Sequence, residues 1–104
     1  MAIIYEVNMQ VDSSILIEYK LWLEDHIADM LTLPWFLDAK MYEELRTDAQ
    51  VNLCIHYHLA SQQELESYFK QDAQKMRTRG ERYWPHVKFQ RRILMERNKH
   101  AQSN

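Results

Sequence analysis

The sequence is poor in the residues that interrupt regular structure and in the residue that crosslinks it. Its 104 residues include one glycine, two prolines and one cysteine. A single glycine excludes the Gly-rich loops that hold phosphate groups in nucleotide-binding domains. A single cysteine excludes a disulfide scaffold and a Cys-rich zinc module, and it agrees with a reducing compartment.

Long apolar runs and targeting signals are also missing. No stretch approaches the roughly 18 apolar residues that a membrane span requires. The first ten residues, MAIIYEVNMQ, lack the basic, apolar and small-residue segments of a secretory signal. We therefore expect a cytoplasmic protein that does not contact a membrane.

The composition that remains is that of an ordinary folded domain, with 46% hydrophobic and 27% charged residues. The length fits a single domain over residues 1–97, followed by a polar tail over residues 98–104. A monomer of this size buries only about two-thirds of the surface of its unfolded chain. Dimerisation would add to its modest stability.

Charge is distributed unevenly along the chain. Residues 1–69 contain 3 Lys and Arg against 12 Asp and Glu, whereas residues 70–100 contain 10 against 3. Halves of opposite sign favour pairing between two copies. The basic half, interleaved with aromatics, also resembles an RNA-binding surface. The isoelectric point of about 6.2 and the missing aromatic pair on the central strands argue against nucleic acid.

Four segments alternate apolar and polar residues with a period of two, which predicts strands over residues 3–11, 36–46, 52–59 and 86–97. A period near 3.6 predicts a helix over residues 13–32, with Asp12 as its N-cap and Pro34 after its end. A second helix begins after Ser61, where Glu64 completes a capping box, and continues past Gly80 to Pro85. Residues 47–50 form a short connection between the second and third strands.

The order of these elements, βαββαβ, predicts an α+β ferredoxin-like fold. In that plan a four-stranded antiparallel sheet has the order 4-1-3-2, and both helices cover one face. The apolar positions predict a core of Ile3, Tyr5, Val7, Leu37, Ala39, Met41, Leu53, Ile55, Tyr57, Val87 and Phe89. The other face is then polar, with Glu6, Asn8, Asp38, Lys40, Tyr42, Glu44, Asn52, Cys54, His56, His58, Lys88, Gln90 and Arg92.

The stretch NLCIHYHL, residues 52–59, places Cys54, His56 and His58 on this polar face, with successive members roughly 6.6 Å apart along the strand. They could bind a metal with help from Glu6 or Asn8, line a ligand cavity or dimer interior, or face solvent. We predict no metal, because no second His or Cys cluster accompanies them.

Four stretches carry a resemblance that covers about residues 3–97: IIYEVN, WLEDHIADML, WFLDAKMY and AQKMRTRGERYWPHVKFQRRILME. Together they resemble an uncharacterised family of small bacterial proteins related to the dimeric α/β-barrel superfamily. The resemblance implies a homodimer in which two sheets face each other and polar-face residues line the space between them. In that superfamily such cavities serve cofactor-independent monooxygenases, haem-degrading enzymes and lactone isomerases, and fold does not choose among these functions.

We therefore predict a dimer that binds a small organic ligand on the polar sheet face, without a cofactor. The alternatives are a cofactor-independent monooxygenase or isomerase that uses the same cavity, and a non-catalytic oligomerisation module. If there is catalysis, His56 or His58 would move a proton and Tyr42 would assist. The predicted ligand-binding residues are Asn8, Cys54, Gln90, Arg92 and His26.

Two of these residues also have simpler interpretations. His26 falls on the apolar side of the first helix, where it would be either a partly buried histidine or an acid or base at the cavity edge. Cys54 would be a nucleophile if a neighbouring histidine lowered its pKa, and otherwise a small hydrophobic residue.

Overall fold

The computed structural model describes residues 2–45, 49–98 and 100–101. Strand β1 (Ile3–Asp12) leads through a 3-10 turn, η1 (Ser13–Ile15), into helix α1 (Leu16–Met30). Strands β2 (Asp38–Glu43) and β3 (Gln50–Leu59) form the next hairpin. Helices α2 (Gln62–Gln71) and α3 (Ala73–Thr78) and a 3-10 segment, η2 (Glu81–His86), precede strand β4 (Val87–Met95).

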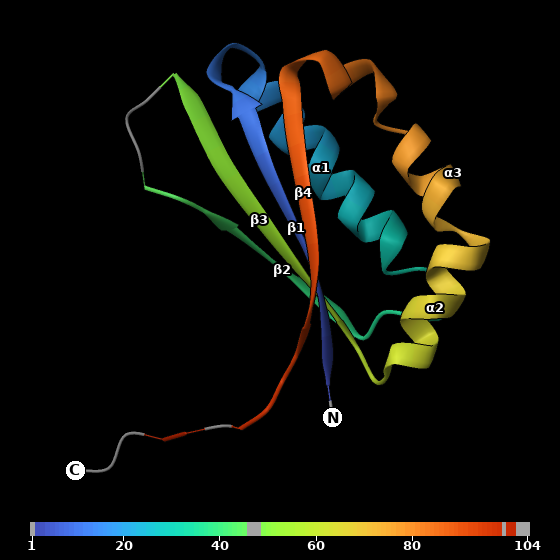
Figure 1. Cartoon of the computed structure of the whole chain (residues 1–104). Helices are drawn as coiled ribbons and strands as arrows, with labels where there is room; N and C mark the ends of the chain where they lie inside the picture. The colour runs from blue at the N-terminus through green and yellow to red at the C-terminus, as the bar shows by residue number, and fades with distance from the viewer. Residues whose placement is uncertain (1, 46–48, 99, 102–104) are drawn as a thin grey trace.

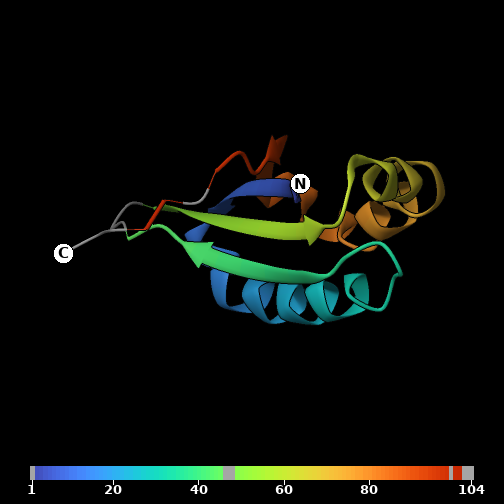
Figure 2. The same cartoon turned by 90° about the horizontal axis from the view of Figure 1, so that it is seen from below.

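The four strands form one antiparallel sheet with the order β2-β3-β1-β4. This confirms the predicted ferredoxin-like α+β fold, with β1 and β3 in the centre. The helices lie on one side of the sheet (Figure 1). In the view from below, α1 runs alongside the strands, and α2 and α3 lie to the right of them (Figure 2). No helix within the described residues is long and apolar enough to cross a membrane.

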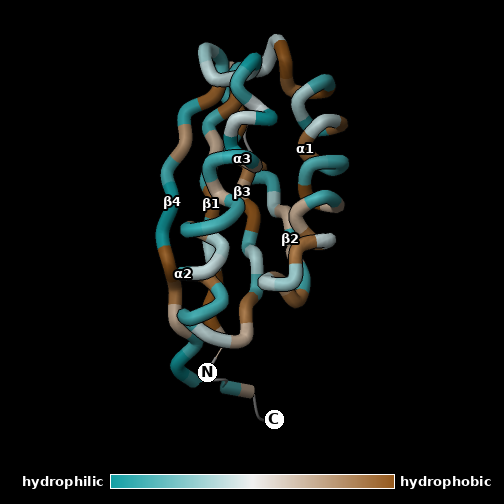
Figure 3. The backbone as a smooth tube through the Cα atoms, turned by 90° about the vertical axis from the view of Figure 1, so that its right-hand side faces the viewer, coloured by the Kyte–Doolittle hydropathy of each residue, from teal (hydrophilic) through white to brown (hydrophobic). Residues whose placement is uncertain are grey.

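The core forms between the sheet and the helices because alternate strand residues point to that side. In β3 every second residue from Val51 to Leu59 is buried, and the residues between them are half-buried. Figure 3 shows brown and teal segments along β1, whereas the second half of β4 is teal and then brown without alternation. In β1, Glu6 interrupts this pattern, since its side chain is buried although it belongs to the polar face.

The first helical segment begins at Ser13, as the sequence predicts, but as the 3-10 turn η1 that precedes α1. The carboxylate of Asp12 accepts a hydrogen bond from the Ser14 backbone N–H at 2.9 Å, which caps the first turn. That turn is 3-10 rather than α-helical, and the helix ends at Met30, two residues before the predicted end. Tyr19, Leu23 and Met30 form its buried stripe.

The start of the second strand was predicted wrongly. Strand β2 begins only at Asp38, and Leu37 is 67% exposed, while Phe36 takes the core position at 7% exposure. The alternation within β2 does not extend backward through the turn that follows α1. Residue 46 at the predicted end of this strand and residues 47–48 of the predicted connection lie outside the described residues, and Gln50 already belongs to β3.

The second helix is interrupted, in contrast to the predicted continuous one. Asp72 leaves the helical conformation between α2 and α3, and its carboxylate accepts a hydrogen bond from the Trp35 indole N–H at 2.7 Å. At the start of α2, the Ser61 hydroxyl donates to the Glu64 carboxylate, so the two predicted capping residues bond to each other. Pro85 lies within η2 rather than at a helix end.

Candidate functional site

The polar face of the sheet is organised around the Glu6 carboxylate, which is only 4% exposed. Glu6 on β1 lies between His56 on β3 and Arg92 on β4, as the strand registers dictate. Arg92 Nε donates to Glu6 Oε1 at 2.5 Å, and Asn8 Nδ2 donates to the same oxygen at 2.7 Å. His56 Nε2 lies 2.7 Å from Glu6 Oε2.

These contacts hold Glu6 in its charged form. The hydrogen bond from Arg92 lowers the pKa of Glu6 to about 2, against the opposing effect of burial, with further lowering from Asn8 and His56. Because the carboxylate is buried, removing Arg92, the partner with a fixed positive charge, would leave a buried negative charge without compensation. From the sequence, Glu6 was expected only to assist a metal site. Its central place in the cluster could have been predicted, because a carboxylate on a central strand has a histidine on one neighbouring strand and an arginine on the other.

The remaining predicted residues of β2 and β3 lie around this cluster. Burial and the nearby Glu6 carboxylate raise the pKa of the Cys54 thiol, which does not favour a nucleophilic role. The Tyr42 ring packs edge-on against His56, with centroids 5.2 Å apart. His58 turns away to Asp38, and its Nδ1 lies 2.5 Å from Asp38 Oδ1.

The polar face therefore brings together part of the predicted site and separates the rest. Asn8, Cys54, His56 and Arg92 surround Glu6, and Tyr42 lies beside them. Gln90 lies opposite Asn8 along the sheet, at an open hollow of about 670 Å³ whose wall is mainly polar and charged. Asp38 accepts a contact from His58, and Arg92 bonds to Glu6, so both charged groups have partners in the same chain.

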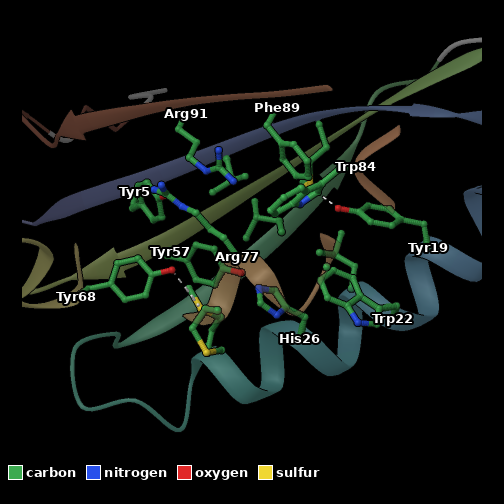
Figure 4. A pocket seen from close by; sticks show the side chains of 17 residues that line it. Tyr5, Tyr19, Trp22, His26, Tyr57, Tyr68, Arg77, Trp84, Phe89 and Arg91 are labelled. Carbon is green, nitrogen blue, oxygen red and sulfur yellow. Dashed lines mark hydrogen bonds between the residues drawn. The ribbon is translucent and has the colours of Figure 1, made fainter. Parts of the chain in front are cut away.

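His26 lies on the opposite side of the sheet from the other predicted site residues. It belongs to α1 and borders a cavity of about 50 Å³ between the helices and the sheet (Figure 4). Its ring stacks on Trp22, with centroids 4.7 Å apart and an interplanar angle of 14°. Among the buried side-chain nitrogens and oxygens of the described residues, His26 Nδ1 is the one that lacks a hydrogen-bond partner.

Burial lowers the pKa of His26 to about 4, and the positive charge of Arg79 adds to this shift, while Asp29 opposes it. The imidazole is therefore neutral at pH 7. A neutral ring with a partnerless nitrogen beside a cavity can accept a proton or a hydrogen bond from a bound molecule.

The cavity wall is aromatic with two cationic groups at its mouth. Tyr5, Tyr57, Tyr68, Trp22 and Phe89 supply ring surfaces, and the exposed Arg77 and Arg91 lie near Tyr5 (Figure 4). Arg77 Nη2 donates to the Tyr5 hydroxyl at 3.0 Å, and the Arg91 guanidinium lies 4.9 Å from the Phe89 ring centroid. The sequence did not identify these arginines as site residues. Arg91 could have been found, because it occupies a helix-facing position in the alternation of β4.

Comparison with known proteins agrees with this fold. The family model described as "Domain of unknown function (DUF4286)" matches residues 2–97, which confirms the resemblance to an uncharacterised family. No curated protein matches the chain.

Several solved structures share the fold. The oxygenase SnoaB from Streptomyces nogalater, described as cofactor-independent, is 9% identical, with a TM-score of 0.76 and coverage of 97% of this chain and 98% of SnoaB. A conserved protein from Methanosarcina mazei is 15% identical, with a TM-score of 0.73 and coverage of 93% and 94%. Rv0793 from Mycobacterium tuberculosis is 10% identical, with a TM-score of 0.72 and coverage of 97% and 100%.

Proposed function

Because the chain belongs to the DUF4286 family, whose description names no activity, we propose a function from its geometry: it binds a small planar organic molecule that carries an acidic group. The ligand lies in the cavity between the sheet and the helices. The observation that carries this proposal is the partnerless Nδ1 of His26 at that cavity.

The cavity wall fits such a ligand. Aromatic faces offer stacking surface for a flat ring, and the two arginines at the mouth attract a carboxylate or a phenolate. A phenol hydroxyl that donates to His26 would satisfy the buried nitrogen, and leaving such a nitrogen without a partner costs about 1 to 3 kcal/mol. The cavity of about 50 Å³ has room for little more than water, so a ring enters only if side chains of its wall move aside.

This location differs from the polar face that the sequence favoured for the ligand. On the polar face Glu6, His56, Arg92 and Asn8 already bond to one another, so a ligand there would have to break existing bonds. The assignment of His56, His58 and Tyr42 to catalysis stays a prediction, and the same experiment tests it.

Ligand-observed fluorine NMR with fluorinated phenols and benzoates tests the location. We expect binding by the wild-type chain and at least about tenfold weaker binding by His26→Phe, which fills the cavity and removes the acceptor. The matched control is His56→Gln on the polar face, which should bind as the wild type does. The opposite pattern would move the ligand to the polar face, and no binding by any of the three would favour an oligomerisation module.

A second candidate is oxygenation or isomerisation of such a ligand without a cofactor. The unpartnered Nδ1 of His26 at the cavity supports it, since a base that removes a phenolic or carbon-bound proton needs a nitrogen that no other group of the protein engages. Oxygen uptake with electron-rich polyphenols measures the oxygenase reaction. Uptake that is equal in the wild type and in His26→Phe would contradict this candidate.

The polar faces of two chains are also proposed to pack together in a homodimer. Internal pairing of Glu6 with Arg92 and His56 supports this, because charges that are already paired cost less to cover. Tyr42, 48% exposed, offers aromatic surface there. Sedimentation should show a shift toward monomer for Tyr42→Arg but none for Leu21→Arg, whose wild-type residue is 63% exposed on α1. A Tyr42→Arg variant with the same proportion of dimer as the wild type would contradict this interface.

A further inference from the structure

Three potential metal ligands of different chemistry converge in the centre of the polar face. The nearest ligand atoms of Glu6, Cys54 and His56 all lie within 4.8 Å of one another. Glu6 and His56 are directly paired across β1 and β3, and Cys54 lies two residues before His56 on the same face. We propose that these three residues bind one transition-metal ion, with zinc as the best match.

The donor set suits zinc. Zinc sites combine thiolate sulfur, imidazole nitrogen and carboxylate oxygen, and a set of three protein ligands leaves a fourth position open for water or another molecule. In a tetrahedral site, nitrogen and oxygen ligands about 2.0 to 2.1 Å from zinc lie roughly 3.3 Å apart. His56 Nε2 and Glu6 Oε2 are 2.7 Å apart, so the ion would replace the shared proton with a small opening of the pair.

The surroundings already orient the ligands. Arg92 and Asn8 both donate to Glu6 Oε1 and leave Oε2 directed toward His56. Hydrogen bonds of this kind to a ligating carboxylate fix its orientation and commonly contribute ten- to hundredfold to metal affinity. The backbone beneath is equally fixed, because β1 and β3 are the two central strands.

The charge balance also permits a dication. Glu6 and a Cys54 thiolate carry two negative charges, and the Arg92 guanidinium carries one positive charge. A bound Zn²⁺ then leaves a net charge of +1 on the cluster. His58 is not part of the group, since Asp38 engages it. This differs from the trio of Cys54, His56 and His58 considered from sequence.

Cobalt spectroscopy provides the test on the full chain, reduced and stripped with a chelator. We expect one Co²⁺ per chain to produce a thiolate-to-cobalt charge-transfer band in the near ultraviolet, and Zn²⁺ to displace it. Cys54→Ser should lose the band, and His56→Gln should weaken Co²⁺ binding at least about a hundredfold. Arg92→Gln, which keeps all three ligands, should weaken it about tenfold as a positioning residue.

The matched control is His58→Gln, which removes a histidine from the same face two residues away and should change Co²⁺ affinity less than about twofold. The conservative Cys54→Ser variant should keep its fold, and its far-ultraviolet circular dichroism checks this. A wild-type chain without a thiolate band at saturating Co²⁺, or a band that persists in Cys54→Ser, would overturn the proposal. The site lies across the sheet from the His26 cavity, so the failure of one proposal leaves the other standing.

Discussion

The two faces of the sheet are built from alternate residues of the same four strands, yet they hold their ionisable groups in opposite ways. On the polar face Glu6 is buried and bonds to Arg92, Asn8 and His56. On the helix face His26 is half-buried, and its buried Nδ1 has no hydrogen-bond partner. A buried polar group without a partner costs free energy that a bound molecule can recover, whereas a paired one contributes to stability only while its partners remain.

The largest contrast is expected between tyrosines on the two faces. Tyr57 is 2% exposed and packs against the rings of Tyr5 and Phe36. Tyr57→Ala should lower the free energy of unfolding by about 3 to 5 kcal/mol. Tyr42 on the polar face of the neighbouring strand is 48% exposed, and its change to alanine should cost less than about 1 kcal/mol. Urea unfolding measures both. Similar losses would mean that both faces are buried in the folded protein, as in a tight dimer.

The second-largest loss of stability is expected when the cluster around Glu6 on the polar face is broken. Glu6→Gln leaves the Arg92 guanidinium and the His56 imidazole without their carboxylate, and we expect it to lower the free energy of unfolding by about 2 to 3 kcal/mol. Asp38→Asn removes the partner of His58 on the same face. The Asp38 side chain is 64% exposed, so this control should cost less than about 1 kcal/mol. If urea unfolding showed equal losses of stability in the two variants, the buried Glu6 cluster would contribute no more to stability than the exposed pair of Asp38 and His58.

Most of the fold was predictable because strand alternation and helical periodicity are local properties of the chain. The element order, the sheet order and the two faces agree with the structure. The errors occur where tertiary contacts override the local pattern. Asp72 leaves the helix and bonds to Trp35, 37 residues away in sequence. Phe36 displaces Leu37 from the core at a turn, where alternation no longer holds.

The candidate sites were less predictable than the fold. The alternation assigned each residue to a face, but it did not determine which side chains meet on that face. The sequence grouped His58 with Cys54 and His56, whereas the strand register and side-chain orientation bring Glu6 to that pair and give His58 to Asp38. The helix-side cavity depends on how α1 and α3 pack on the sheet, which no local pattern contains.

The single glycine tests the packing that positions His26. A methyl group added at Gly80 would lie 2.7 Å from the Trp22 ring, and His26 stacks on that ring. Gly80→Ala should therefore displace Trp22 and cost about 1 to 3 kcal/mol. The same substitution in a Trp22→Leu background should cost much less, because the ring that it meets is gone. Urea unfolding of the four chains measures this coupling, and equal costs in both backgrounds would contradict it.

The smallest expected effect is a pH dependence specific to the helix face. Burial lowers the pKa of His26 to about 4 in the folded chain, whereas an unfolded histidine titrates near 6.5. The unfolded state therefore binds the proton more readily, so His26 contributes stability that is fully present above about pH 6.5 and is lost as the pH falls toward 4. Between pH 7 and pH 4 the free energy of unfolding should therefore fall by about 1 to 2 kcal/mol less in His26→Phe than in the wild type, as measured by urea unfolding. An identical slope in the variant would mean that the His26 imidazole binds protons equally well in the folded and the unfolded chain, and the contrast between the two faces would not exist.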